Sequence, residues 1–221
     1  MTTVLQFGPV LVHLDALFAG LVQTLKLAVL SILFGTAIGV LGAVGRSFGP
    51  RWLSVVLSAY VELIRNTPLL IQLYIVFFSL PLIGLKFSSN TAAIIALSIH
   101  LGAYATEILR AGVESIDRGQ IEAAKSLGLR PYRIIRHVVL APAVRAVYPA
   151  LSAQFILQLM GTSVVGAIAA EELTAIANNL VMQTFRSFEV YIIVAVIYFV
   201  VVQAASLALT GLGKLMFRWK T

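Results

Sequence analysis

The sequence predicts an all-α integral membrane protein that crosses the bilayer five times. Hydrophobic residues make up 60% of its 221 residues and charged residues only 11%, whereas soluble globular chains carry roughly 25% charged residues. So little charge cannot cover a water-soluble domain of this length, which argues against a soluble enzyme, a disordered chain and a free nucleic-acid binder. The chain has no cysteine, so it holds no disulfide and no cysteine-based metal site.

Five stretches that lack acidic and basic residues have about the length of a spanning helix, which needs roughly 20 residues. They cover residues 27–45, 66–85, 87–106, 146–170 and 190–213, and an apolar run at 52–61 precedes the second. Lipid requires backbone polar groups to pair within the segment, which favours helices, and the alternating pattern of a membrane barrel is absent. We therefore expect residues 1–221 to form a single transmembrane domain.

The basic residues predict the orientation. The net charge is +7, and most of the basic residues fall on one side of the five predicted spans, which the positive-inside rule assigns to the cytoplasm. The N-terminus is then outside and the C-terminus cytoplasmic, and the absence of a basic leader segment predicts no cleavable signal peptide. The cytoplasmic set is Arg46, Arg51, Arg65, Arg110, Arg118, Lys125, Arg130, Arg133, Arg136, Arg145, Lys214, Arg218 and Lys220.

The loop between the third and fourth spans, about 111–137, predicts a short helix. Acidic Asp117 suits the start of a helix and Gly128 suits its end. Apolar Ile116, Ile121, Ala124 and Leu127 recur at helical spacing and predict one apolar stripe. A helix this short and charged either lies on the membrane surface or docks into a partner, and its small residues favour docking.

The same loop resembles a known motif. Glu122-Ala123-Ala124, three residues, Gly128, nine residues and then Val138-Val139-Leu140 are similar to the EAA loop of ABC importer permeases, E-A-A-x3-G-x9-I-x-L-P. The sequence departs from that pattern at its end, where Ala141 replaces the family's proline and Pro142 follows one residue later. This shift displaces a kink or helix start by one residue.

Further motifs narrow the resemblance to polar amino-acid permeases, from about residue 20 to about residue 180. Their order and spacing along the chain are more specific than any one of them alone. They are Gly20 with Thr24, the string YVELIRNTPLLIQ at 60–72, Gly102-Ala103-Tyr104 followed by Glu107 and Arg110, Thr162-Ser163, and Glu172-Leu173.

The resemblance implies an ABC type I importer-like permease fold and the membrane subunit of an amino-acid uptake system in the bacterial inner membrane. Two permease subunits would form the path, two ATPase subunits would bind ATP and Mg²⁺, and an extracytoplasmic binding protein would deliver substrate. This chain is then not itself an enzyme and carries no cofactor, because it lacks the G-x4-G-K-[ST] motif of a phosphate-binding loop.

The resemblance assigns ATPase coupling to the cytoplasmic loop. Small side chains at Ala123 and Ala124 allow close contact, Glu122 can pair with a basic residue of the ATPase, and Leu127 and Gly128 end the helix; the alternative is an ordinary connecting helix. At the same membrane edge, i,i+3 spacing predicts structural ion pairs rather than a gate. These pairs are Glu62 with Arg65 and Glu107 with Arg110.

Substrate contacts are expected from polar groups on the fourth span. The stripe formed by Gln154, Gln158 and Thr162 either lines the path or bonds another helix, and the two readings are evenly weighted. Glu172 lies beyond the span, where it either attracts a cationic substrate or, as we favour, serves as a docking surface or a helix cap. His100, in the third span, is predicted to be a buried hydrogen-bonding histidine rather than a proton relay. The candidate path residues are Gln154, Gln158, Met160, Gly161, Thr162, Ser163 and Glu172.

One departure from the amino-acid permeases affects the pairing of subunits. Met160-Gly161 stands where the family has Lys-Asp, so the charges that could hold both ends of a zwitterion are missing. Either a different permease subunit supplies them in a heterodimer, which we favour slightly, or a homodimer binds substrate by hydrogen bonds and apolar contacts. The competing functions are a self-sufficient channel or secondary transporter for a small polar solute, and a membrane assembly factor.

Overall fold

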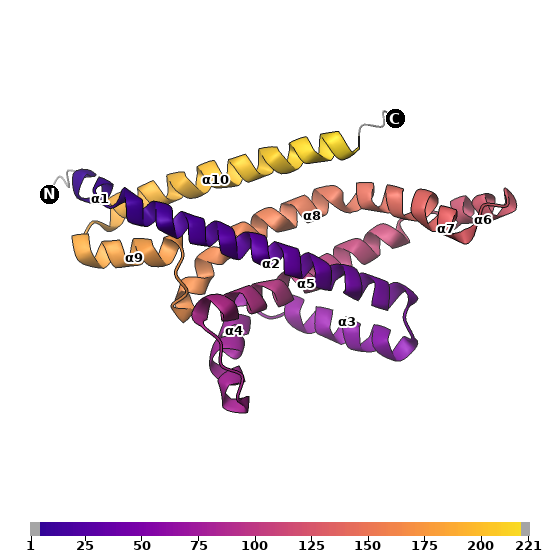
Figure 1. Cartoon of the computed structure of the whole chain (residues 1–221), viewed down its shortest axis with the longest axis horizontal. Coiled ribbons are helices and arrows are strands. Elements are labelled where there is room, and N and C mark those ends of the chain that lie inside the picture. Colours follow the sequence, from indigo (N-terminus) through magenta and orange to yellow (C-terminus); the bar gives the residue numbers. More distant parts are fainter. Residues whose placement is uncertain (1–4, 218–221) are drawn as a thin grey trace.

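The computed structural model describes residues 5–217, apart from the side chains of Arg118 and Pro131. Within that range it consists of helices and the turns that join them, with no β-strand, which confirms the all-α prediction (Figure 1). Arg218 and Lys220, which belong to the predicted cytoplasmic charges, lie outside the described residues.

Among the described residues, four helical stretches are individually long and apolar enough to cross a membrane. They are α2 (Leu14–Phe48), α5 (Ser89–Glu114), the stretch Ile134–Ile168 and α10 (Ser187–Met216). α2 and α10 extend beyond both ends of the charge-free stretches that predicted them, α5 extends beyond the C-terminal end of its stretch, and Ile134–Ile168 extends beyond the N-terminal end. At about 1.5 Å rise per residue, the 35 residues of α2 and of Ile134–Ile168 reach past the hydrocarbon layer or cross it at a tilt.

The second predicted crossing is a broken helix: within the predicted stretch 66–85 residues Leu69–Ile83 are helical, and the apolar run before it belongs to a separate helix. α3 (Arg51–Arg65) and the helical stretch Leu69–Ile83 meet at 110°, so five crossings result only if this bent pair counts as one. Pro68 has no backbone N–H to continue the helix, and it adopts an extended conformation before α4. The amide of Gln72 closes the corner by donating to the carbonyls of Ile64 and Thr67 at 2.8 and 3.0 Å.

The remaining elements are short and lie mainly at the two ends of the bundle. The start of α2 lies beside α9 at one end, and α6 and α7 lie at the other, while α10 runs toward α6 and α7 but ends short of them (Figure 1). The segment that begins with α4 projects sideways (Figure 1). The bounds of the short elements are α1 (Gly8–Leu11), α4 (Leu69–Tyr74), η1 (Ile75–Ser79), η2 (Leu80–Ile83), α6 (Arg118–Ser126), α7 (Pro131–Arg133) and α9 (Leu173–Thr184). The long stretch Ile134–Ile168 consists of η3 (Ile134–Leu140), α8 (Ala141–Gly161) and η4 (Thr162–Ile168).

Helices α2 and α5 approach one another closely because glycines face the contact. A Cβ placed on Gly39 would lie 2.4 Å from the Cβ of Ala105, and one on Gly35 would lie 2.7 Å from the Cβ of Leu101. Glycines spaced four apart let membrane helices pack backbone against backbone, where van der Waals contact replaces the hydrophobic driving force available in water. This contact sets the position of the last turns of α5, which lead directly into the loop that contains α6.

Two apolar clusters hold the other elements. One contains Leu27, Leu73 and Leu97, and so joins α2, α4 and α5. The second contains Leu17 and Val190, and it joins α2 to the start of α10. Beyond its first turns α10 is largely exposed within the single chain, so most of its apolar surface is left for lipid or for another subunit.

Candidate functional site

The predicted loop helix forms with the predicted boundaries. Asp117 is the N-cap of α6, and its Oδ1 accepts a hydrogen bond from the Gly119 N–H at 2.8 Å. At the other end Gly128 adopts φ +71°. Its N–H donates to the Lys125 carbonyl at 2.9 Å, and the Leu129 N–H donates to the Ala124 carbonyl at 3.2 Å. This pair of bonds is a Schellman motif, which needs a left-handed residue and so favours glycine.

The face of α6 differs from the predicted stripe at one residue. Ala124 is buried and Ile121 is half-buried, as predicted, but the side chain of Leu127 is 80% exposed. Leu127 is the C-cap, so the chain leaves the helix there and its side chain departs from the apolar face. Glu122 and Ala123 are also exposed, so the outer surface of α6 combines a carboxylate, a small residue and a large apolar residue.

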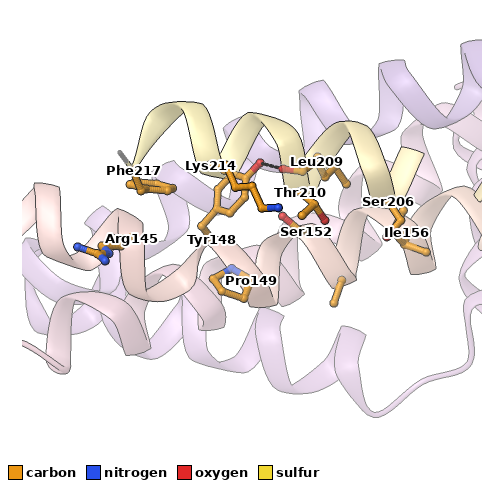
Figure 2. A pocket seen from close by; sticks show the side chains of 12 residues that line it. Arg145, Tyr148, Pro149, Ser152, Ile156, Ser206, Leu209, Thr210, Lys214 and Phe217 are labelled. Atoms are coloured by element: carbon orange, nitrogen blue, oxygen red, sulfur yellow. Dashed lines mark hydrogen bonds between the residues drawn. The ribbon is translucent and has the colours of Figure 1, made fainter. Parts of the chain in front are cut away.

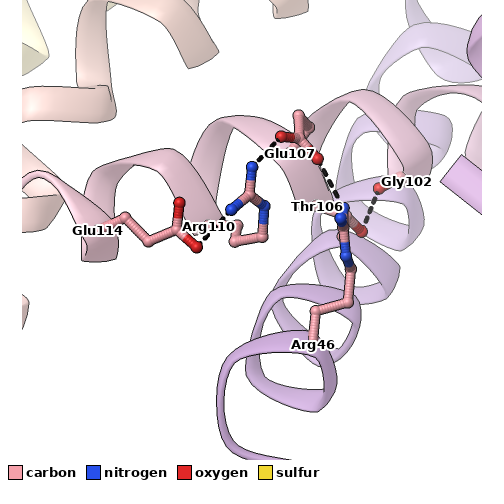
Figure 3. Close-up of polar contacts among 6 residues, drawn as sticks. All are labelled: Arg46, Gly102, Thr106, Glu107, Arg110 and Glu114. Carbon is pink, nitrogen blue, oxygen red and sulfur yellow. Dashed lines mark hydrogen bonds and ion pairs between the residues drawn. The ribbon is translucent and has the colours of Figure 1, made fainter. Parts of the chain in front are cut away.

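An ionic network lies at the base of this loop (Figure 3). Glu107 forms an ion pair with Arg110, as the spacing predicted, and Arg110 also pairs with Glu114. In addition, Arg46 of α2 contacts the Glu107 carboxylate at 2.6 Å. One carboxylate therefore joins two helices whose contributing residues lie 61 positions apart, and no local pattern in the sequence indicated this pair.

The second predicted pair is wrong. In the part of the chain that the structure describes, Glu62 and Arg65 do not form an ion pair; both are exposed. The Arg65 guanidinium lies over the ring of Tyr104 instead, 5.4 Å from its centroid, an arrangement that attracts a cation to the ring face. Arg65 is the last residue of α3, where the chain turns away, and this places it beside α5.

The polar stripe of the fourth span is buried, and its members have different surroundings. The Gln158 amide donates to Ser31 Oγ at 3.1 Å and to the Leu97 carbonyl at 2.9 Å, so this residue bonds α8 to α2 and α5. Thr162 donates to the Leu159 carbonyl of the preceding turn at 2.7 Å. Of the two readings left open for the stripe, helix bonding therefore holds for Gln158.

Gln154 lies at a cavity of about 140 Å³ between α8, α5 and the start of α4. His100 and Tyr104 contribute from α5, and their rings lie 4.9 Å apart. His100 Nδ1 is 3.1 Å from Oε1 of Gln72, whose amide nitrogen donates elsewhere. Because that oxygen only accepts, the network assigns the proton to Nδ1. The lining residues are Leu69, His100, Tyr104, Gln154, Leu157, Gln158 and Gly161.

The other predicted path residues lie away from this cavity. Met160 and Ser163 line a separate groove against α10. Glu172 is fully buried and caps α9, where its carboxylate accepts from the backbone N–H groups of Thr174 and Ala175 at 2.8 and 2.7 Å. Burial raises the pKa of Glu172 above its ordinary value, against the lowering effect of these bonds. The helix-cap reading of Glu172 is confirmed.

Sequence reasoning missed the contribution of α5 and the broken span to this site. Gln72 and Tyr104 belong to motifs that supported the resemblance, but they were not proposed as site residues. The signal that could have found them is their polarity at predicted membrane depth, since polar groups there are costly and tend to serve a function.

Apolar helices long enough to span a membrane, a loop helix with an exposed face and a polar cavity among α4, α5 and α8 are consistent with the membrane subunit of a transporter. The family described as "binding-protein-dependent transport system inner membrane component" matches residues 31–217. The chain belongs to this family and is an inner-membrane permease subunit.

Individual relatives agree with this assignment. Two proteins of Bacillus subtilis (strain 168) are similar to it. One is described as "probable glutamine ABC transporter permease protein GlnP" and is 38% identical, over 89% of this chain and 91% of the relative. The other is described as "probable glutamine ABC transporter permease protein GlnM" and is 35% identical, over 88% of this chain and 90% of the relative. A crystal structure described as "an amino acid ABC transporter with histidines" superposes with a TM-score of 0.89, at 35% identity, over 96% of this chain and 99% of that one.

Proposed function

We propose that this permease carries an uncharged polar amino acid, of which glutamine is the first candidate. The observation that supports it is the cavity beside α5, where none of the seven described lining residues is a formally charged carboxylate, lysine or arginine, and where Gln154, His100 and Tyr104 offer hydrogen-bonding groups. Such groups suit a side-chain amide, because a buried polar ligand must exchange its bonds with water for bonds with protein. The relatives named for glutamine transport point the same way.

The partners follow from two exposed surfaces. The outer face of α6, with Glu122, Ala123 and Leu127, would dock an ATPase subunit that binds ATP and Mg²⁺, and this face would be cytoplasmic, with the N-terminus outside. A binding protein would deliver the amino acid on the opposite side. The segment Leu69–Ile83 projects from the bundle with Phe78 and Leu82 exposed, which supports cover by a second permease subunit.

That second subunit is proposed to be a different chain. A zwitterionic amino acid carries an ammonium and a carboxylate, and the cavity lining of this subunit offers no formal counter-charge to either. A partner that retains a charged pair would supply both. Two membrane subunits of different mass in the purified transporter would support this pairing, and a single species would contradict it.

The substrate assignment is tested by uptake in proteoliposomes that contain the complete transporter. Replacing Gln154 with leucine should raise the glutamine concentration at half-maximal uptake about tenfold, since a lost hydrogen bond to a bound polar group is worth about 1.5 kcal/mol. The matched control is Gln203→Leu, which changes an exposed glutamine of α10 and should leave uptake unchanged. No competition by glutamine for uptake, or equal effects of the two variants, would contradict the assignment.

Coupling is tested at α6. Glu122→Lys reverses a charge on the exposed face, and Gly128→Asp places a Cβ and a negative charge at the end of the helix, on a backbone with φ +71° that favours glycine, at a cost of about 1 kcal/mol. Both should reduce uptake at least tenfold while the chain still inserts and ATP hydrolysis continues. Ser126→Ala, an exposed neighbour on the same helix, should transport normally. Normal uptake in Glu122→Lys and Gly128→Asp would refute the coupling role.

A further inference from the structure

A second groove, unconnected with the predicted path residues, lies between α8 and the last turns of α10 (Figure 2). Its volume is about 610 Å³. One stretch of its lining carries the basic residues Arg145 and Lys214, and another is apolar, with Ala153, Ile156 and Leu209. The groove is therefore amphipathic along its length.

The groove is held open by one aromatic side chain. The Tyr148 hydroxyl of α8 donates to the Leu209 carbonyl of α10 at 2.6 Å. The ring of Tyr148 packs on Gly213, where an added Cβ would lie 2.6 Å from Cε1 of the ring, and it meets Phe217 edge to face with the centroids 5.3 Å apart. These contacts fix the separation of the two helices at this level, so the groove is formed before any ligand enters.

The polar groups of the groove favour an anion. The twelve described lining residues include Arg145 and Lys214 but no aspartate or glutamate, and within residues 5–217 neither cation takes part in an ion pair. Figure 2 shows the Lys214 side chain directed along the groove toward Thr210 and Ser152. The Ser152 hydroxyl is buried and lacks a hydrogen-bond partner among the described residues.

We propose that this groove binds an anionic phospholipid, with the phosphate beside Lys214, Thr210 and Ser152, Arg145 at the mouth of the groove, and an acyl chain along Ile156 and the exposed side of α10 (Figure 2). The two cations suit the headgroup phosphate of a lipid, and the hydroxyls of Ser152 and Thr210 suit its ester region. The apolar part of the groove suits its acyl chain. Basic pockets between spanning helices on the cytoplasmic side are suited to such headgroups. The inference rests on the proposed orientation, which places Arg145 and Lys214 at the inner membrane interface.

A second protein chain is the competing occupant. It would have to bring carboxylates to Arg145 and Lys214, since the described lining of the groove contains no acidic residue. An anionic lipid is the abundant source of negative charge at this interface.

The test measures lipid retained by the complete transporter. The complex is purified in detergent, equilibrated with equal amounts of phosphatidylglycerol and phosphatidylcholine, and the bound lipid is counted by native mass spectrometry. Wild type should retain phosphatidylglycerol preferentially. Each basic residue near the surface contributes about a fivefold preference, so Arg145→Gln with Lys214→Gln should lower that preference about 25-fold. Arg51→Gln, which removes an exposed charge at the start of α3, should have no effect.

A second measurement is independent of transport and of the charge variants. Because the chain has no cysteine, Ala153→Cys, at an exposed position of the groove, places a single photoreactive label there. Adducts with phosphatidylglycerol would support the proposal, and adducts with a permease subunit would overturn it in favour of a protein interface. Equal lipid preference in wild type and the double variant would also overturn it, whatever amino acid the transporter carries.

Discussion

Replacing Gly39 with leucine should prevent α2 from packing on α5 and leave little folded protein. The Cβ of any residue at this position would lie 2.4 Å from Ala105 Cβ and 3.1 Å from the Ala105 carbonyl carbon, which is backbone and cannot rotate away. Overpacking of a flexible site costs about 1–3 kcal/mol, and a backbone clash should exceed the upper end of that range. The measurement is the yield of monodisperse transporter in detergent and its thermal midpoint.

The control for this variant lies on α10. A Cβ on Gly211 meets nothing within 4 Å, so Gly211→Leu should change stability by less than about 0.5 kcal/mol, as surface substitutions usually do. Gly39→Ala should already destabilise the protein, because the clash arises at the Cβ. Wild-type stability of Gly39→Leu would mean that α2 and α5 do not meet through this face.

The sequence predicted best the features that depend on residues close together in the chain. Charge-free stretches located the apolar helices because each charged residue placed in lipid carries its own free-energy cost. Asp117 and Gly128 marked the ends of α6 because capping depends on the residues of the cap itself. The break at Asn66-Thr67-Pro68 was not recognised, since Pro is also found within spanning helices, and the bonds from the Gln72 amide to the carbonyls of Ile64 and Thr67 that accompany the break join residues on its two sides.

The candidate site depends on contacts that spacing does not reveal. The stripe of Gln154, Gln158 and Thr162 was found by its helical period, but the period does not state which neighbour each side chain meets. Gln158 bonds two other helices, while Gln154 lies at the cavity. Leu127 shows the same limit on a smaller scale, because a helical period predicts a side-chain direction only up to the last helical residue.

Replacing Glu107 with lysine should destabilise the protein by disrupting the ionic network between α2 and α5. The Glu107 side chain is 25% exposed and is the shared partner of Arg46, itself 15% exposed, and Arg110. The variant would place three positive charges together, partly out of water. Breaking a buried pair costs about 3–5 kcal/mol, and the partial exposure here lowers the expected loss to about 2–3 kcal/mol. Glu114→Lys is the control, because Glu114 is 59% exposed and such surface pairs contribute about 0–1 kcal/mol.

A compensating change distinguishes lost charge from lost shape. Arg46→Glu added to Glu107→Lys restores an opposite charge across α2 and α5, so the double variant should recover much of the thermal midpoint lost by Glu107→Lys alone. If the double variant loses as much stability as the sum of the losses in Glu107→Lys and Arg46→Glu alone, Arg46 and Glu107 do not interact. The network joins α2 to the last turns of α5, and the chain from there reaches α6 within a few residues. Stability and coupling should therefore fall together in Glu107→Lys and recover together in the double variant.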